Sequence, residues 1–241
     1  MSERVWLALI CGFGLLIIIL YWELVLAEGT HLGTGVVVRL YDWTAKRYED
    51  IKSFQPEFED HCLGLPLARL LASVSTPLVL DVAAGTGRLA RTLIRQTTFD
   101  GRVVALDMSE GMLRQVYKHI PERSEHVGLL LGTADGLPFA CDTFEAVACL
   151  EVLEFTPDLH AVLAECERVL RPGGQLVVSN RIGPEARWLV GKTVSSPGLE
   201  GLLSEIGLHV SRVDAWQVDY DLAWATKPAT EVALERGLSR A

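Results

Sequence analysis

Apolar runs alternate with segments of helical spacing from Leu78 onward. Five short runs are rich in apolar and β-branched residues, and three segments between them repeat apolar residues at the three- and four-residue spacing of an amphipathic helix. We expect strands at 78–83, 102–107, 126–132, 144–150 and 174–180, and helices at 88–96, 109–119 and 157–170. Nearly continuous apolar strands that alternate with such helices predict a parallel sheet covered on both faces.

The last part of the chain has a different order. A helix-like stretch, PGLEGLLSEIG (197–207), is followed by two strand candidates, LHVSRVDAWQ (208–217) and YDLAWATK (220–227), with no helix between them. Strands joined without a crossover helix pair antiparallel. The whole pattern therefore predicts an α/β fold: a Rossmann-like, doubly wound, mostly parallel sheet of seven strands that ends in an antiparallel pair.

An uncharged apolar run, VWLALICGFGLLIIILYW (5–22), precedes this pattern. As a helix it would be about 27 Å long, close to the ~30 Å of a hydrocarbon core, and aromatic residues stand at both of its ends. We therefore predict a single transmembrane helix that anchors the protein. A signal peptide cleaved before Glu28, a buried core helix and a dimerising helix are the alternatives. Three basic residues follow the run and one precedes it, which favours a cytoplasmic C-terminal side (Arg4; Arg39, Lys46 and Arg47).

The net charge and the cysteine pattern argue against nucleic-acid binding, a disulfide framework and a metal site. The net charge of -9 argues against a surface that neutralises nucleic-acid phosphates, so no nucleic-acid partner is expected. The five cysteines are scattered, odd in number and without a CxxC pair, which is typical of a reduced compartment and of neither a disulfide framework nor a metal site (Cys11, Cys62, Cys141, Cys149 and Cys166).

The stretch LVLDVAAGTGRLA (78–90) places a turn of small residues between a strand and a helix. Such a turn lets backbone approach a ligand at the carboxyl end of the strand, where open α/β sheets bind ligands and a helix N-terminus favours negative groups. The next strand ends in Asp107, about twenty residues after the glycines, a spacing that suits a carboxylate bound to ribose hydroxyls. A ligand that contains adenosine is therefore predicted.

Two ligand types share this pattern, the dinucleotides and S-adenosyl-L-methionine. The turn lacks the third glycine of a dinucleotide fingerprint. Asp81, inside the strand end, can orient a cationic amino-acid group but would repel a pyrophosphate. Asp135, in GTADGLPF, follows the third strand and can accept from an adenine amino group. These features favour S-adenosylmethionine over the nicotinamide cofactor of an oxidoreductase.

The same motifs resemble those of the class I S-adenosylmethionine-dependent methyltransferases. DVAAGTG (81–87) is similar to the family motif D-x-G-x-G-x-G, with Ala83 in place of the first glycine, and Asp107 matches its ribose-binding acid. GTADGLPFACDTFEAVACLEVLEF resembles the family's adenine loop and fourth strand, and ECERVLRPGGQLVVSN its fifth strand. YDWTAKRYED (41–50) is similar to the lead-in of the type 11-like branch, which includes the ubiquinone and menaquinone biosynthesis enzymes.

The resemblance implies a methyltransferase with S-adenosylmethionine as cofactor. It implies cofactor contacts at Asp81, Ala83, Gly85, Thr86, Gly87, Asp107, Met108, Ala134, Asp135 and Leu150, and a substrate or lid position for Tyr41, Tyr48 and Glu154. Core packing is the alternative for the aromatic residues of the lead-in. Methyl transfer from a sulfonium needs mainly alignment, so a general base is required only if the acceptor must lose a proton. Glu151 is the one candidate for such a base or for an orienting residue.

We therefore expect a single-pass membrane methyltransferase with a cytoplasmic catalytic domain and a small, lipophilic acceptor such as a quinone, isoprenoid or lipid. The insertion after Asn180 is too short for a protein-substrate domain. The alternative is a methyltransferase-fold subunit that binds the cofactor and has a structural role in a membrane complex. The expected boundaries are 1–28 for the anchor, 29–77 for a connector and helical lid, 78–228 for the cofactor-binding domain and 229–241 for a tail.

Overall fold

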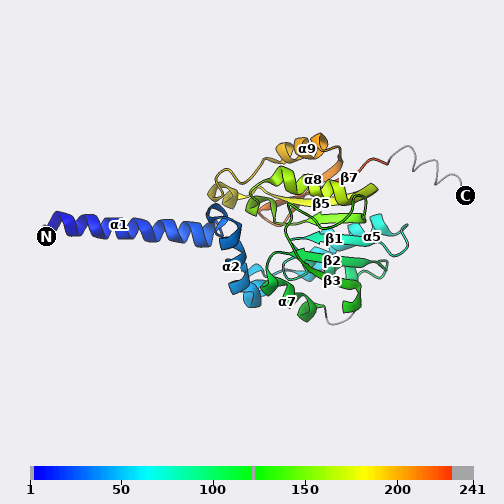
Figure 1. Cartoon of the computed structure of the whole chain (residues 1–241), viewed down its shortest axis with the longest axis horizontal. Coiled ribbons are helices and arrows are strands. Elements are labelled where there is room, and N and C mark those ends of the chain that lie inside the picture. Colours follow the sequence, from blue (N-terminus) through cyan, green and yellow to red (C-terminus); the bar gives the residue numbers. More distant parts are fainter. Residues whose placement is uncertain (1–2, 121–122, 230–241) are drawn as a thin grey trace, which may run out of the picture.

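A seven-stranded sheet forms the centre of the protein, for which a computed structural model describes residues 3–120 and 123–229 (Figure 1). The spatial order of the described strands is β3-β2-β1-β4-β5-β7-β6, and among them only β7 runs against its neighbours. The order reverses between β1 and β4, which is where a doubly wound sheet forms its ligand crevice. The predicted fold class is confirmed. The strands are β1 (Leu78–Val82), β2 (Arg102–Asp107), β3 (Val127–Leu131), β4 (Phe144–Cys149), β5 (Leu170–Arg181), β6 (His209–Trp216) and β7 (Tyr220–Thr226).

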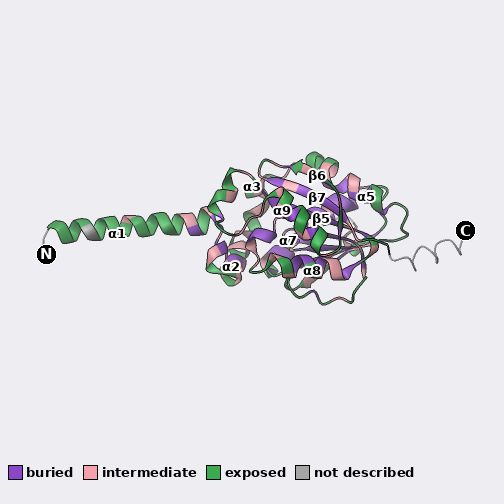
Figure 2. Ribbon diagram, turned by 90° about the horizontal axis from the view of Figure 1, so that it is seen from above, coloured by how far each residue is buried: buried purple, intermediate pink, exposed green. Residues whose placement is uncertain are grey.

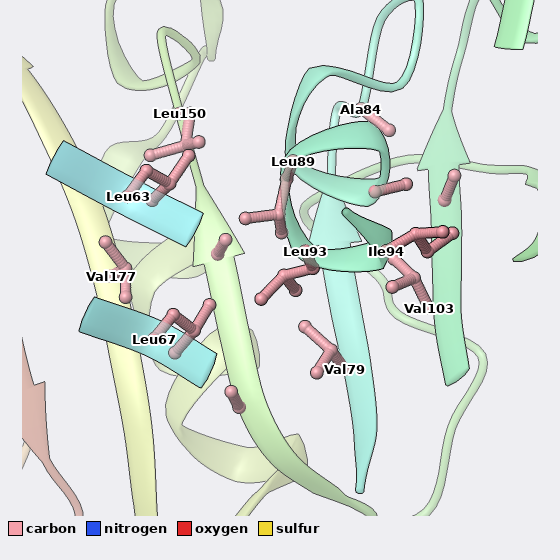
Figure 3. Packing of buried hydrophobic residues seen from close by; sticks show 14 of the residues in the cluster. Leu63, Leu67, Val79, Ala84, Leu89, Leu93, Ile94, Val103, Leu150 and Val177 are labelled. Carbon is pink, nitrogen blue, oxygen red and sulfur yellow. The ribbon is translucent and has the colours of Figure 1, made fainter. Parts of the chain in front are cut away.

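Helices cover both faces of the sheet, because successive side chains of each strand point to opposite faces. Val79 of β1 packs into one apolar cluster and Leu80, the next residue, into the other. Figure 3 shows the first cluster, in which Leu63 and Leu67 lie over Val177 while Leu89 and Leu93 lie near Val79. The helices of the first face are α5 (Leu65–Leu71), α6 (Arg88–Ile94) and α7 (Glu110–His119), and those of the second are α8 (Leu159–Val169) and α9 (Ser196–Glu205).

Side-chain caps fix where three of these helices begin. The Ser109 hydroxyl accepts from the Met112 N–H, as expected of an N-cap, and Asp158 and Ser195 cap α8 and α9 in the same way. α8 ends at Val169, but β5 begins directly at Leu170, four residues before the predicted strand. The reason is that Gly173 and Gly174 exchange backbone hydrogen bonds with Lys227, so the RPGG stretch belongs to the sheet.

The N-terminal part begins with one long helix, α1 (Glu3–Tyr21), which projects from the domain with exposed side chains (Figure 2). None of its apolar stretch is buried, so it is not a core helix of this fold. A π-helical turn continues it, and a chain of short helices follows. These are η1 (Trp22–Leu26), η2 (Thr30–Leu32), α2 (Thr34–Thr44), η3 (Ala45–Arg47), α3 (Tyr48–Lys52), α4 (Pro56–Glu59) and η4 (Asp60–Gly64).

Three more short helices of the described residues lie in the loops of the sheet, and one of them borders the site. They are η5 (Ser124–His126), η6 (Leu153–Phe155) and η7 (Pro184–Trp188). Almost all of the predicted tail lies outside the described residues, which end at 229.

Candidate active site

A cavity of about 200 Å³ lies at the carboxyl ends of β1, β2 and β4, next to the strand-order reversal. Its wall on the N-terminal side is formed by α2 and α3, and residues from the loops after β1, β2, β3 and β4 complete it. The cavity brings together most of the residues expected from the sequence: Tyr41, Tyr48, Asp81, Ala83, Gly85, Thr86, Asp107, Met108, Ala134, Asp135, Leu150 and Glu151. Gly87 and Glu154 do not line it.

Three residues of the turn after β1 have a left-handed backbone conformation. Ala83, Gly85 and Gly87 have φ values of +54°, +55° and +84°. A Cβ atom on Gly87 would lie 2.8 Å from Val116, so this glycine serves the close packing of α6 against α7. A Cβ on Gly85 would meet only Tyr48, at 4.0 Å, so here the backbone faces the cavity. Ala83 carries a conformational cost of about 1–2 kcal/mol that a glycine would avoid.

Asp107 is held in a fixed orientation at the end of β2. Its Oδ2 accepts from the Gly85 N–H at 2.8 Å and its Oδ1 accepts from the Ser109 N–H at 2.7 Å. Burial raises the pKa of Asp107, and these backbone donors oppose the rise. An ionised carboxylate has about four acceptor positions, so Asp107 retains the capacity to accept from two ribose hydroxyls.

Asp81 is a buried acid with an unsatisfied oxygen. Its Oδ2 atom has no hydrogen-bond partner among the residues that the structure describes, and its side chain lines the cavity. Burial raises the pKa of Asp81 to about 8, although the nearby Arg88 acts to lower it. A buried carboxyl without a donor is costly, and a cationic donor would relieve that cost. The ammonium group of a bound amino acid has this chemistry, so the residues present fit the methionine part of S-adenosylmethionine.

Residues after β2 and β3 form another part of the wall. Met108 and Asp135 are exposed at the edge of the cavity, and Ala134 lies between Asp135 and the exposed Thr133. Met108 and Ala134 offer apolar surface, and Asp135 offers a carboxylate acceptor. An adenine ring requires both, because it has apolar faces and an amino donor at its edge.

Glu151 lies two residues after the end of β4 and has a left-handed backbone, with φ of +55°. Its carboxylate forms ion pairs at 2.8 Å with both Lys52 Nζ and Arg88 Nη2. Burial alone would raise the pKa of Glu151, but these two cations lower it to about 2. A carboxylate with so low a pKa is a weak proton acceptor at neutral pH. The geometry therefore favours an orienting role for Glu151 over a general base.

Arg88 is a residue of the cavity wall that sequence reasoning missed. It is the first residue of α6 and is 8% exposed. Its guanidinium lies between the rings of Phe54 and Trp216, with Cζ at 4.4 and 4.6 Å from the two centroids, and it pairs with Glu151. The signal in the sequence was a charged residue placed directly between a glycine turn and an apolar helix.

Acidic side chains tie α2 and α3, which we call the lid, to the domain. Asp42 Oδ1 accepts from the Ser109 hydroxyl at 2.5 Å and from the Gly111 N–H at 2.9 Å. Glu49 accepts from the Thr86 hydroxyl and, at 3.0 Å, from Arg91. Both carboxylates lie at helix N-termini, which favour negative charge.

Two aromatic residues of segment 41–50 line the cavity, and a third is exposed to solvent. Tyr41 and Tyr48 line the cavity, with ring centroids 5.9 Å apart, and Tyr41 also meets Phe155 at 5.8 Å. Burial raises the pKa of Tyr41 well above its usual value, so its hydroxyl stays neutral. Trp43, by contrast, is 82% exposed and belongs to neither the cavity nor the core.

Glu154 requires a correction, because the structure places it away from the cavity. The η6 turn directs its side chain inward, where it accepts from the Tyr220 hydroxyl at 2.6 Å and lies 3.8 Å from Arg181. Glu154 is 1% exposed, so its side chain is buried inside the domain and is not part of the lid.

Comparison with known proteins supports the chemistry of this cavity. Residues 80–178 match the family model of a methyltransferase domain. A ubiquinone biosynthesis O-methyltransferase of Hahella chejuensis is 33% identical over 144 residues, which are 59% of each chain. A demethylmenaquinone methyltransferase of Streptomyces avermitilis is 30% identical over 195 residues, which are 80% of each chain. The chain spans from 38% to 80% of the length of the curated relatives that it matches.

The fold is also found in a solved structure, that of the [4+2]-cyclase SpnF. The TM-score is 0.68 at 16% sequence identity, and the alignment covers 82% of this chain and 97% of the cyclase. A likeness at this identity shows the fold alone. The sequence relatives show the family: the chain belongs to the class I S-adenosylmethionine-dependent methyltransferases, in the branch that resembles the quinone-biosynthesis enzymes. S-adenosylmethionine is therefore its cofactor, as predicted.

Proposed function

We propose that this protein transfers the methyl group of S-adenosylmethionine to a small, lipophilic acceptor at a membrane in which α1 anchors it. The proposal rests on the position of α2 between α1 and the cavity. This helix begins only seven residues after Ala27, and it forms a wall of the cofactor cavity through Thr34, Val37 and Val38. The anchor and the cavity are thus adjacent parts of the chain.

When bound, the cofactor supplies a methyl group that its sulfonium already activates for displacement. The chain's residues bind and align. Asp81 would hold the ammonium group, Asp107 the ribose hydroxyls and Asp135 the adenine amino group. The rings of Tyr41 and Tyr48 line the cavity and would provide an apolar surface for an acceptor. Among the residues that line the cavity, Glu151 is held ionised by two cations, so it would orient an acceptor rather than take up its proton.

The segment after α1 supports an uncleaved anchor. Ala27 is fully buried, and the Thr30 hydroxyl donates to the Glu154 carbonyl at 2.6 Å. Cleavage before Glu28 would cut between these two contacts and would separate Ala27 from the domain into which it packs. A signal peptide is normally removed from an accessible, extended site. The basic residues after the helix support a cytoplasmic domain, where S-adenosylmethionine is made.

The relatives support the class of acceptor. One is named for ubiquinone biosynthesis and another for demethylmenaquinone. A quinone-like acceptor combines a reactive ring with an apolar chain, and an anchored enzyme meets such a compound at high local concentration.

The test uses the full-length protein in lipid vesicles, with a membrane lipid extract and S-adenosylmethionine labelled in its methyl group. We expect label in the solvent-extractable fraction. Asp107→Ala removes two charge-assisted hydrogen bonds of about 1.5–3 kcal/mol each and should weaken S-adenosylhomocysteine binding at least tenfold, with a parallel loss of labelling at limiting cofactor. Tight S-adenosylhomocysteine binding without labelling of any lipid or small-molecule fraction would favour the structural subunit.

A further inference from the structure

Three exposed apolar side chains lie beside the base of α1. Leu32 is 48% exposed, Trp188 43% and Val190 68%, and we call these three residues the apolar rim. Leu32 belongs to η2, directly after the anchor, whereas the other two lie at and after η7. The segments are held together, because His31 Nε2 lies 3.3 Å from the Val190 carbonyl and η7 packs against η1. Exposed apolar side chains gathered in this way mark an interaction surface.

The apolar rim borders the cavity on two sides. Thr34, which lines the cavity, follows Leu32 by two residues. On the other side, the Thr156 carbonyl accepts from Lys192 Nζ at 3.4 Å, two residues after Val190, and Thr156 also lines the cavity. Pro157 is both exposed and part of the lining, so the cavity reaches the surface here.

The position of α1 relative to this edge is set by specific contacts. η1 continues α1 as a helical turn, and the buried Ala27 follows it. Glu28 then pairs with the buried Arg181 of β5 at 3.4 Å and accepts from the Tyr41 hydroxyl at 2.8 Å. Figure 1 shows that α1 leaves the domain beside α2, which is also the side of the cavity. A bilayer that contains α1 would therefore meet the apolar rim.

We infer that the apolar rim is a second membrane-contact surface, which rests in the interfacial layer and directs the cavity entrance toward the lipid. This inference rests on the proposed anchoring by α1. Tryptophan favours the headgroup level of a bilayer, and the exposed Arg187 beside Trp188 can meet anionic headgroups. The rim continues the apolar surface of α1, and an acceptor dissolved in the membrane can enter the cavity without crossing water.

The experiment measures bilayer depth at three single cysteines in the full-length protein, reconstituted in phosphatidylcholine–phosphatidylglycerol vesicles. Cys62 and Cys141 are replaced by serine throughout, while Cys149 and Cys166 are buried and stay. The first protein keeps Cys11, in α1. The other two carry Cys11→Ser together with Val190→Cys or with Leu70→Cys. Leu70 is 48% exposed on α5, which lies away from α1 (Figure 1), and serves as the matched control. Each thiol receives a spin label, and collision with oxygen is compared with collision with a water-soluble nickel chelate.

We expect labels at Cys11 and at Val190→Cys to be shielded from the nickel chelate at least tenfold relative to the label at Leu70→Cys. A shielded Cys11 with a Val190→Cys label as accessible as the control would overturn the apolar rim as a membrane surface and leave the anchor intact. An accessible Cys11 would overturn both the anchor and the rim. S-adenosylhomocysteine binding by the same three proteins tests the cofactor site separately, since none of the changed residues lines the cavity.

Discussion

The Nζ atom of Lys52 lies 2.8 Å from Oε2 of Glu151, although 99 positions separate the two residues in the chain. Lys52 ends α3 of the lid, and Glu151 follows β4 beneath it. The same carboxylate pairs with Arg88 at the start of α6. One acid thus joins the lid, the sheet and the helix that follows the glycine turn.

Lys52→Met should loosen the lid while the domain stays folded. The Lys52 side chain is 22% exposed, so its charge-assisted bond is expected to contribute about 1–2 kcal/mol, between an exposed and a buried pair. Backbone amides of α2 and α3 should then exchange with solvent about five- to thirtyfold faster. Hydrogen exchange measures this, and Lys46→Met, on the exposed part of the same lid, is the control. Equal protection of the lid in both variants would contradict the role of Lys52.

Glu151→Gln should cost more, because it leaves the buried Arg88 without its closest acid. We expect a loss of about 3–5 kcal/mol in the free energy of unfolding at pH 7. The pKa of Glu151 is lowered in the folded state, so its contribution is fully present above its unfolded pKa of about 4.5 and is lost as pH falls toward about 2.

Urea unfolding at pH 7 and pH 3 tests this, and the difference between wild type and Glu151→Gln should shrink at pH 3. Glu110→Gln is the control, because Glu110 is 65% exposed in its pair with Arg114 and should change stability by less than about 0.5 kcal/mol. A difference that is the same at both pH values would show that Glu151 is not the stabilising ion.

Binding of S-adenosylhomocysteine should release a proton from Asp81. Its pKa of about 8 leaves it mostly protonated at pH 7, and a bound ammonium group would favour the carboxylate. We expect about 0.9 proton released per site at pH 7 and much less at pH 9. Calorimetry in buffers of different ionisation enthalpy measures the number.

Asp81→Asn, which cannot ionise, should bind more weakly and release no proton from this site. Asp81 also affects the free protein: since its pKa is raised on folding, the free energy of unfolding should fall as pH rises from about 4 to about 8. Proton release by Asp81→Asn equal to that of the wild type would assign the proton to another group.

Ala83→Gly should stabilise the protein by about 1 kcal/mol, because Ala83 has a left-handed backbone that glycine adopts without steric cost. Ala84, the next residue, has no positive φ, so Ala84→Gly should instead destabilise by about 0.5–1 kcal/mol. Thermal unfolding of the two variants measures both changes in stability, so that Ala84→Gly serves as the control for Ala83→Gly. The opposite order of stability would contradict the strained turn.

The sheet and the cofactor wall could be predicted because their signals are local. Alternating apolar runs marked the strands, and Ser109 marked the start of a helix. Small residues after β1, the acid at the end of β2 and the acid after β3 indicated the cavity, since parallel strands bring their carboxyl ends to one edge. The sequence could not show that Ala83 is strained, because the family pattern gives residue size and not φ.

The contacts of the lid could not be predicted, because each joins residues far apart in the chain. Asp42 and Glu49 look like ordinary surface acids of a helix, and their partners lie 37 to 69 positions away. Glu154 was misplaced for a local reason. It lies three residues after Glu151, but it belongs to the η6 turn, and its side chain contacts Tyr220 and Arg181 instead of lining the cavity.

The short connector between Ala27 and Thr34 has a consequence for the form of the acceptor. Seven residues reach at most about 25 Å when extended, and here they are folded into a turn and pinned by Glu28 and Thr30. If α1 is inserted in a membrane as proposed, the cavity would stay close to the headgroups and would not follow a molecule into the cytosol. A long-chain amphiphile would offer its polar end to the cavity while its tail remained among the lipids. Turnover should therefore depend strongly on the reactive ring and little on the length of the tail.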